Sequence, residues 1–233
     1  EQLQKVGINP GPIIIEPYVK NTAPAILAAS FYALEQDEDA ILLVCSSDHL
    51  IPDTTKMHEV ICRAMPSVME GNLVNFGIEP TSAETSYGYL KVGSLGTKAT
   101  VKLEKFIEKP TKKLAENLIE SGNYLWNAGI FFFRARDMIE AFEEHCVDLL
   151  NPVKTALKLA VEDLGFIRLD LKSWNSCKDI SIDYAIMELA SNLSTISFDG
   201  QWSDLGGWGA VWEARLPDEN GVVTSDNSTS IEC

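Results

Sequence analysis

The stretch Ala40-Ile41-Leu42-Leu43-Val44-Cys45, followed by Ser46-Ser47-Asp48-His49, decides the predicted fold. A continuous apolar run of this length is typical of a central strand in a parallel sheet. The neighbouring strands and helices are predicted at residues 13–15, 24–34, 57–69 and 72–77. This β-α-β-α-β alternation predicts an α/β fold in which helices cover a parallel sheet.

The second half of the chain alternates less regularly. Its strands are predicted at 87–92, 101–107, 129–134 and 194–198, and its helices at 111–121, 137–146, 152–161 and 182–190. A loop entering a short helix is expected at 202–212, and the stretch 220–233 is polar. No repeat, linker or heptad pattern interrupts the chain, so the simplest account is a single domain over 1–233.

The composition is strongly acidic, with a net charge of −15 and a pI of about 4.6. Such a surface repels nucleic acid, and a phosphate ligand would need a metal ion or a nearby lysine. No apolar run approaches the ~20 residues of a membrane span, so neither a nucleic acid nor a membrane is an expected partner. Five unpatterned cysteines fit reduced thiols in a cytoplasmic protein.

The run Phe106-Ile107-Glu108-Lys109-Pro110 places an anion and a cation where an apolar strand ends. Pro110 cannot extend a ladder, so it ends the strand. Open α/β sheets bind ligands beyond the carboxyl ends of their strands. The pair therefore suits a ligand with hydroxyls and a phosphate, such as a sugar phosphate, although a surface ion pair before a turn is the plainer interpretation.

Two aspartates are candidate ligands for Mg²⁺. Asp48 directly follows the buried run, and Asp204 lies in Trp202-Ser203-Asp204-Leu205-Gly206-Gly207-Trp208, where glycines allow close approach of a ligand. Mg²⁺ usually takes one or two protein carboxylates and completes its shell with water and phosphate oxygens. Alternatively, Asp48 forms an Asx turn and Asp204 caps the helix that follows.

Further polar positions allow both a binding and a structural interpretation. Asn127 offers a donor and an acceptor to sugar hydroxyls, or is a turn residue. Gly88, beside Tyr89, either admits a ligand to the backbone or marks a β-bulge.

Two helix starts complete the candidates. Asn21, Thr22 and Pro24 begin the first helix, where they could contact a base or an anion, or simply cap the helix. Asp183 opens a later helix, and there a helix-dipole partner is favoured over a catalyst.

The order of these motifs resembles that of the sugar-phosphate nucleotidylyltransferase family, most closely its mannose-1-phosphate guanylyltransferases. The shared motifs span nearly the whole chain and are Glu16-Pro17, Lys20-Asn21-Thr22-Ala23-Pro24, Asp48-His49, Phe76-Gly77-Ile78, Gly88-Tyr89, Phe106–Pro110, Trp126-Asn127-Ala128-Gly129, Ser181-Ile182-Asp183-Tyr184 and Trp202–Gly206. The resemblance implies a Rossmann-like (GT-A-like) nucleotidyltransferase fold with a mixed central sheet flanked by helices. It also implies transfer of GMP from GTP to mannose 1-phosphate, giving GDP-mannose and pyrophosphate.

The same resemblance implies roles for individual residues. The catalytic group would be Lys109, Asp48 and Asp204; sugar-phosphate contacts would come from Glu108, Lys109, Asn127, Gly88 and Tyr89; nucleotide contacts would come from Asn21, Thr22, Pro24 and Asp48. Asp48 and Asp204 would bind Mg²⁺ as the cofactor. GTP and mannose 1-phosphate are the implied partners, and a homodimer is left open.

One feature of the family is not found in this sequence. Family members begin with a strand and a Gly-rich loop that carries a catalytic arginine, whereas this chain starts just ahead of the Asn21-Thr22-Ala23-Pro24 motif. The resemblance therefore implies a fragment of a longer reading frame, with weak GTP binding and impaired turnover on its own.

Three other functions stay open. The first is a nucleotidylyltransferase for glucose 1-phosphate and thymidine or uridine triphosphate, against which the 21–24 and 126–129 motifs argue. The second is a non-catalytic sugar-nucleotide-binding or assembly module, which the missing loop favours. The third is a Rossmann-type oxidoreductase, which is disfavoured because no GxGxxG follows a strand.

Overall fold

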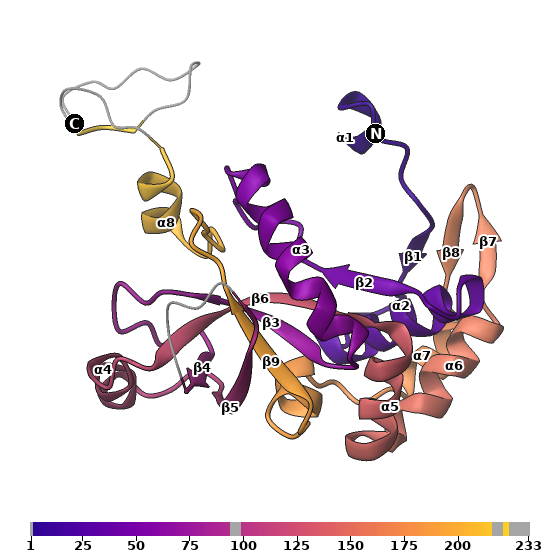
Figure 1. The fold of residues 1–233 in the computed structure, drawn as a ribbon. Coiled ribbons are helices and arrows are strands. Elements are labelled where there is room, and N and C mark those ends of the chain that lie inside the picture. The colour runs from indigo at the N-terminus through magenta and orange to yellow at the C-terminus, as the bar shows by residue number, and fades with distance from the viewer. Residues whose placement is uncertain (1, 94–98, 216–220, 224–233) are drawn as a thin grey trace.

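The computed structural model describes residues 2–93, 99–215 and 221–223 as an α/β arrangement (Figure 1). The strands are β1 (Ile13–Ile15), β2 (Ile41–Val44), β3 (Leu73–Ile78), β4 (Tyr89–Val92), β5 (Val101–Ile107), β6 (Tyr124–Arg134), β7 (Val161–Asp163), β8 (Phe166–Arg168) and β9 (Leu193–Ser197). The α-helices are α1 (Gln2–Lys5), α2 (Thr22–Gln36), α3 (Thr54–Met69), α4 (Lys112–Glu120), α5 (Ala135–His145), α6 (Leu150–Lys158), α7 (Leu171–Asn175) and α8 (Trp208–Glu213). A 3₁₀ turn, η1 (Val147–Leu149), and a π-helical turn, η2 (Asp183–Met187), complete the elements.

The main sheet has six strands in the order β2-β6-β3-β9-β5-β4, and β4 pairs with β6 as well. The long strand β6 runs antiparallel to β2, β3 and β4, whereas β3 and β9 are parallel. The sheet is therefore mixed and flanked by helices, which confirms the predicted fold class. Because β6 contacts three strands, residues along it can bring together loops from distant parts of the chain.

The parallel sheet predicted from the first three strands is wrong. β1 pairs in parallel with β8 in a separate three-stranded sheet, and β2 pairs only with β6 among the described strands, so it lies at an edge. β2 and β3 do run in the same direction, but β6 lies between them. The reason is the aromatic run 131–133 of β6, which is buried on both faces of the sheet and so takes an interior position.

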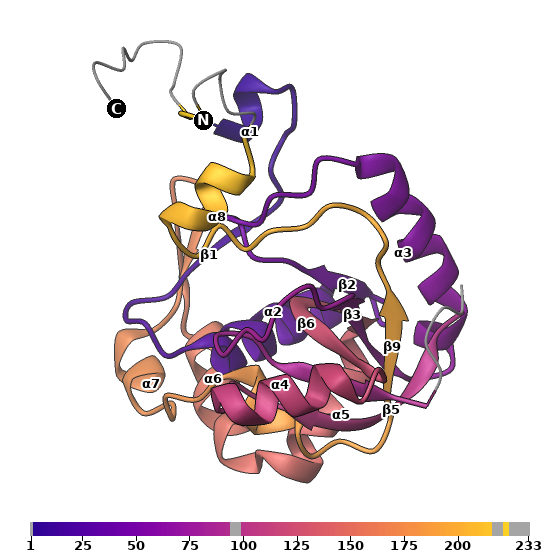
Figure 2. The ribbon, with the colours of Figure 1, turned by 90° about the vertical axis from the view of Figure 1, so that its left-hand side faces the viewer.

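Helices cover both faces of the main sheet (Figures 1 and 2). On one face α2, α5 and α6 pack against Phe131 and Phe133, and on the other face α3 packs against Phe76 and Phe132. Helix α4 covers a smaller cluster around Trp126. No helix in the described ranges combines the length and the apolar character needed to cross a bilayer.

Several boundaries differ from the predicted ones. β6 begins at Tyr124 rather than residue 129, so Asn127 lies inside a strand and is not a turn residue. The predicted helix at 152–161 ends at Lys158, and the β7–β8 hairpin and α7 follow it, none of which was predicted. Most of the stretch 220–233 lies outside the described residues.

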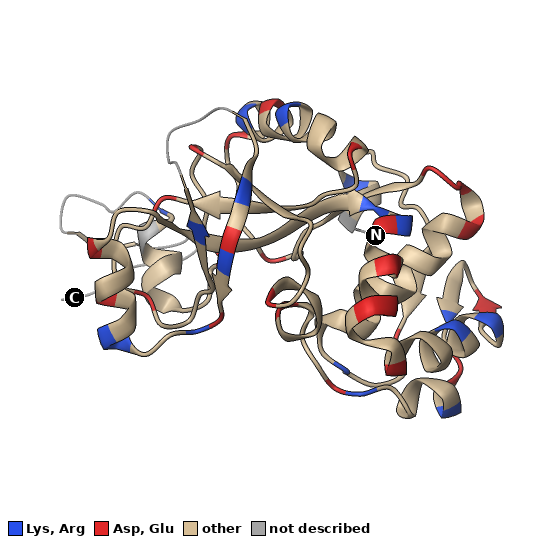
Figure 3. Cartoon of the chain, turned by 60° about the horizontal axis from the view of Figure 1, so that its bottom comes forward, with Lys and Arg blue, Asp and Glu red and all other residues tan. Residues whose placement is uncertain are grey.

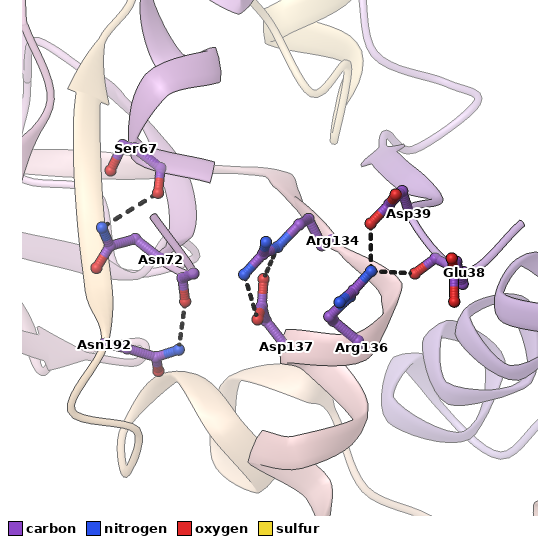
Figure 4. Close-up of polar contacts among 9 residues, drawn as sticks. Glu38, Asp39, Ser67, Asn72, Arg134, Arg136, Asp137 and Asn192 are labelled. Atoms are coloured by element: carbon purple, nitrogen blue, oxygen red, sulfur yellow. Dashed lines mark hydrogen bonds and ion pairs between the residues drawn. The ribbon is translucent and has the colours of Figure 1, made fainter. Parts of the chain in front are cut away.

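The carboxyl end of β6 is anchored by a polar network (Figure 4). Arg134 donates two hydrogen bonds to Asp137, at 2.6 and 2.9 Å, and Arg136 contacts Asp39 and the carbonyl oxygen of Glu38. In the adjoining turn before β3, the Asn72 side chain donates a hydrogen bond to the Ser67 carbonyl oxygen, and the Asn192 side chain donates one to the Gly71 carbonyl oxygen. This network fixes the carboxyl end of the strand that carries Asn127.

Candidate functional site

A pocket of about 190 Å³ lies where several strand ends and loops meet. Its lining includes five residues predicted from the sequence, namely Thr22, Gly88, Glu108, Asn127 and Asp204. They come from the start of α2, the loop before β4, the end of β5, the middle of β6 and the loop before α8. The structure therefore brings together segments that the sequence motifs had assigned to a common site.

Glu108 and Lys109 form an ion pair at the edge of this pocket. Lys109 Nζ lies 2.9 Å from Glu108 Oε1, and the two side chains are 60% and 6% exposed, respectively. The hydrogen bond to Glu108 raises the pKa of Lys109 above its usual range. Because the carboxylate is buried and lines the pocket, this pair differs from an ordinary surface ion pair.

Asn127 has a fixed orientation in the pocket wall. Its Nδ2 donates to Asp183 Oδ1 at 3.3 Å, and its Oδ1 accepts from the backbone N–H of Gly129 at 3.2 Å. The backbone N–H of Asn127 also donates to the Gly88 carbonyl oxygen at 2.8 Å. The two side-chain bonds fix the orientation of the amide, with its nitrogen toward Asp183 and its oxygen toward Gly129.

Asp183 is a pocket residue whose position the sequence did not reveal. It starts η2, as the helix-start motif indicated, but its side chain also lines the pocket beside Asn127. Burial, followed by the nearby charge of Glu108, raises the pKa of Asp183 from 3.8 to about 6, although Lys109 opposes the shift. No local pattern predicts this environment, because Asn127 and Glu108 lie 56 or more residues away in the chain.

Asp48 and Asp204 lie on two segments that pair with each other. The backbones of Leu50 and Ser203 exchange hydrogen bonds of 2.8 and 3.1 Å. The charges of both carboxylates act on His49: burial lowers the pKa of this residue, and Asp48 and Asp204 raise it more weakly. The two acidic groups are therefore on the same side of the molecule, as the predicted metal site requires.

Two carboxylates suit a hard divalent cation that keeps most of its water and phosphate ligands. Asp48 is exposed and does not line the 190 Å³ pocket, whereas Asp204 does. Asp204 is not the N-cap of α8, because that position is Gly207. In the described part of the chain, no group of three or more His, Cys, Asp or Glu side chains is arranged to hold a metal ion.

The start of α2 contacts the pocket through Thr22. Asn21 is the N-cap, as predicted, and its side chain accepts from the Thr22 N–H at 3.0 Å. Thr22 Oγ1 in turn accepts from the Ile182 N–H at 2.8 Å, which ties α2 to the segment before η2. Asn21 itself is exposed and Pro24 is buried, and neither lines the pocket.

Aromatic side chains form another wall. Tyr87 and Trp202 line the 190 Å³ pocket and also a second space of about 800 Å³ that extends toward α8. Tyr89, predicted to contact the hexose, lies instead in the core with no exposed surface, and its hydroxyl donates to the Glu84 carbonyl oxygen at 2.9 Å.

Figure 3 shows acidic and basic residues interspersed over the described chain. With a net charge of −15, the protein as a whole repels a phosphate ligand. Lys109 supplies a cation beside the pocket, where it can offset that repulsion locally.

A mixed α/β sheet with carboxylates, an amide and a lysine gathered where strands and loops meet is typical of proteins that bind nucleotides and sugars. A family model described as nucleotidyl transferase matches residues 1–221. The chain therefore belongs to the nucleotidyl transferase family.

Its curated relatives include mannose-1-phosphate guanylyltransferases. One from Sinorhizobium fredii (strain NGR234) is 40% identical over 231 residues, which cover 99% of this chain and 45% of the relative. Another, from Escherichia coli K12, is 37% identical over 229 residues, covering 96% and 48%. The chain thus spans about half the length of the curated relatives that it matches.

Two solved structures share the fold. A Helicobacter pylori protein titled mannose-6-phosphate isomerase has a TM-score of 0.77 and 27% identity, with 86% of this chain and 77% of that chain covered. A Thermus thermophilus protein titled mannose-1-phosphate geranyltransferase has a TM-score of 0.75 and 30% identity, with 88% and 58% covered.

Proposed function

We propose that this chain is the nucleotidyl-transferring part of a protein that transfers GMP from GTP to mannose 1-phosphate, releasing pyrophosphate. The observation that carries the proposal is the convergence of Glu108, Asn127, Gly88 and Asp204 on one pocket. The names of relatives at 37–40% identity supply the substrates. A cytoplasmic location and a homodimer stay predictions.

In this proposal the hexose lies against Glu108 and Asn127. The buried Glu108 carboxylate accepts hydrogen bonds from sugar hydroxyls, and Asn127 offers an amide whose orientation is already fixed. Gly88 allows close approach, since a Cβ at this position would lie 2.8 Å from Glu108 Oε2. Lys109, whose side chain is mostly exposed, reaches outward to the sugar phosphate.

The nucleotide lies between the start of α2 and the two aspartates. Backbone N–H groups at the start of a 15-residue helix favour an anion, and Thr22 places that helix end at the pocket. Mg²⁺ bound by Asp48 and Asp204 would neutralise charge on the phosphate oxygens.

The reaction needs positioning more than acid–base catalysis. A phosphate oxygen of mannose 1-phosphate attacks the α-phosphorus of GTP, the bond from that phosphorus to the bridging oxygen breaks, and pyrophosphate leaves. Lys109 holds the attacking phosphate, and Glu108 with Asn127 fixes the sugar, so that the attacking oxygen is held in line. Lys109 also offsets part of the negative charge that gathers as the phosphates approach.

Two measurements test the proposal. The first is pyrophosphate release from the four nucleoside triphosphates, each combined with mannose 1-phosphate or glucose 1-phosphate. Release should require GTP and mannose 1-phosphate together. A preference for UTP or dTTP with glucose 1-phosphate would instead favour a different sugar nucleotidylyltransferase.

The second measurement is calorimetry of the purified chain with mannose 1-phosphate and with GDP-mannose, which does not depend on turnover. Glu108→Gln should weaken binding of mannose 1-phosphate at least 10-fold. Glu104→Gln is the matched control, because Glu104 lies on β5, the strand that leads into Glu108, but forms an exposed ion pair with Lys91. The absence of binding heat for both ligands, or equal losses in the two variants, would refute the proposed pocket.

A further inference from the structure

Tyr87 connects the loop before β4 to Asp204. Its hydroxyl donates to Asp204 Oδ1 at 2.9 Å, across 117 residues of sequence. The same oxygen accepts from the Gly206 N–H at 3.1 Å. Both bonds described for this carboxylate thus involve Oδ1, which fixes the plane of the group and leaves Oδ2 available to a ligand.

The position of the Tyr87 hydroxyl is itself fixed by two tryptophans. The Tyr87 ring contacts Trp126 edge-on, with ring centres 5.2 Å apart and planes at 70°, and contacts Trp202 at 5.5 Å and 68°. Trp126 is 7% exposed. Trp202 also packs edge-on against His49, with ring centres 5.4 Å apart. The aromatic cluster of Tyr87, Trp126 and Trp202 therefore holds the phenol at a set distance from Asp204.

We propose that Tyr87 is a positioning residue for the divalent cation: its hydroxyl holds Asp204 in the orientation in which the carboxylate binds the ion. The inference rests on the proposed function, since it requires a cation at Asp204. A carboxylate whose rotation is already restricted loses less entropy on binding, and hydrogen-bond partners of metal ligands commonly affect metal affinity about 10- to 100-fold.

Mn²⁺ serves as the probe, because its electron paramagnetic resonance signal reports free and bound ion without any need for turnover. Tyr87→Phe keeps the ring that packs against the tryptophans and removes only the hydroxyl. Its Mn²⁺ affinity should fall about 10-fold, while its urea unfolding midpoint stays that of the unchanged chain.

Tyr124→Phe is the matched control. Tyr124 lies on β6 and packs at the same cluster around Trp126 as Tyr87 does, so the substitution removes a hydroxyl from the same surroundings. Its Mn²⁺ affinity should be unchanged. A loss equal to that of Tyr87→Phe would overturn the inference, because a general loosening of the cluster would then explain both.

The double variant Tyr87→Phe with Asp204→Asn tests whether Tyr87 acts through Asp204. It should bind Mn²⁺ no more weakly than Asp204→Asn alone, since the two residues act as one unit. If Asp48→Asn and Asp204→Asn lose Mn²⁺ but Tyr87→Phe does not, the inference is overturned and the proposed metal site stands. If the unchanged chain binds no Mn²⁺, both the proposed metal role and the inference fail.

Discussion

Replacement of Asp183 by asparagine should change how the stability of the fold depends on pH. The pKa of Asp183 is about 6 in the folded chain, against an ordinary value of 3.8, because the carboxyl is buried and faces Glu108. Between these two values the unfolded chain has released the proton that the folded chain still holds. Folding stability contributed by this group therefore falls as the pH rises from 3.8 to about 6.

The size of the effect follows from the same two values. At about 1.4 kcal/mol per pH unit, the difference corresponds to at most about 3 kcal/mol of unfolding free energy. Asparagine does not ionise, yet its side-chain oxygen can still accept the hydrogen bond from Asn127. Asp183→Asn should thus become more stable, relative to the unchanged chain, as the pH increases from 4 to 7.

Urea unfolding followed by tryptophan fluorescence at pH 4, 5, 6 and 7 measures this difference. Asp179→Asn, the same substitution at an exposed position, is measured alongside it as the control. The reasoning is refuted if the difference between Asp183→Asn and the unchanged chain is the same at every pH, or grows as the pH falls. In either case the folded environment would not disfavour the charged carboxylate.

Unfolding measurements in urea can test three predictions about the backbone. Asn21 has φ 65° and ψ −169°, a region that glycine occupies; both Asn21→Gly and Asn21→Ala lose the side-chain cap, so Asn21→Gly should be about 1 kcal/mol more stable than Asn21→Ala, and equal stabilities would contradict the strain at this position. Lys109 has φ 45°, so Lys109→Gly should be about 1 kcal/mol more stable than Lys109→Ala, and equal stabilities would contradict the strain. Gly88→Ala should cost about 1–3 kcal/mol, because the new Cβ would meet Glu108 Oε2 at 2.8 Å and Phe106 Cζ at 3.0 Å; an unchanged midpoint would show that both neighbours yield.

Elements with local determinants were predictable from the sequence. The alanine-rich run and the Asn21 cap define α2, and β5 ends at Ile107, shortly before Pro110. Strand pairing was harder, because it depends on partners far away in the chain. The run 40–45 looked central, but it pairs with β6, which lies some 90 residues further on.

The segment 124–128 shows why β6 was predicted too short. Asn127 and Gly129 suggested a turn, and Gly129 does have φ 66°. Pairing with β3 and β4 on either side nevertheless carries the strand through this irregularity, so tertiary pairing overrides the local signal. Asn127 is consequently held more rigidly than a turn residue would be.

The site was predictable as a set of residues but not as a set of contacts. Motif order pointed to Glu108, Asn127 and Asp204, which do line one pocket. The motifs gave no sign that Asp183 would face Asn127 or that Tyr87 would bond to Asp204, since these pairs are separated by 56 and 117 residues. Burial and long-range contacts, rather than residue type, give Asp183 and Tyr87 their environments.

Backbone strain marks the same site independently of the motifs. Among described non-glycine residues, positive φ angles occur at Asn21, Lys109, Leu164 and Leu205. Leu164 sits in the exposed β7–β8 turn, where such a conformation is ordinary.

The other three strained residues each directly adjoin a pocket-lining residue, namely Thr22, Glu108 and Asp204. A non-glycine residue held in this region costs about 1–2 kcal/mol, and such costs persist where they fix the direction of a functional side chain. Lys109→Gly should therefore be more stable than Lys109→Ala and yet bind mannose 1-phosphate more weakly, because both variants lack the amine but only with glycine does Glu108 lose its fixed direction. Stabilisation with unchanged binding of mannose 1-phosphate in calorimetry would show that the strain has no part in the site.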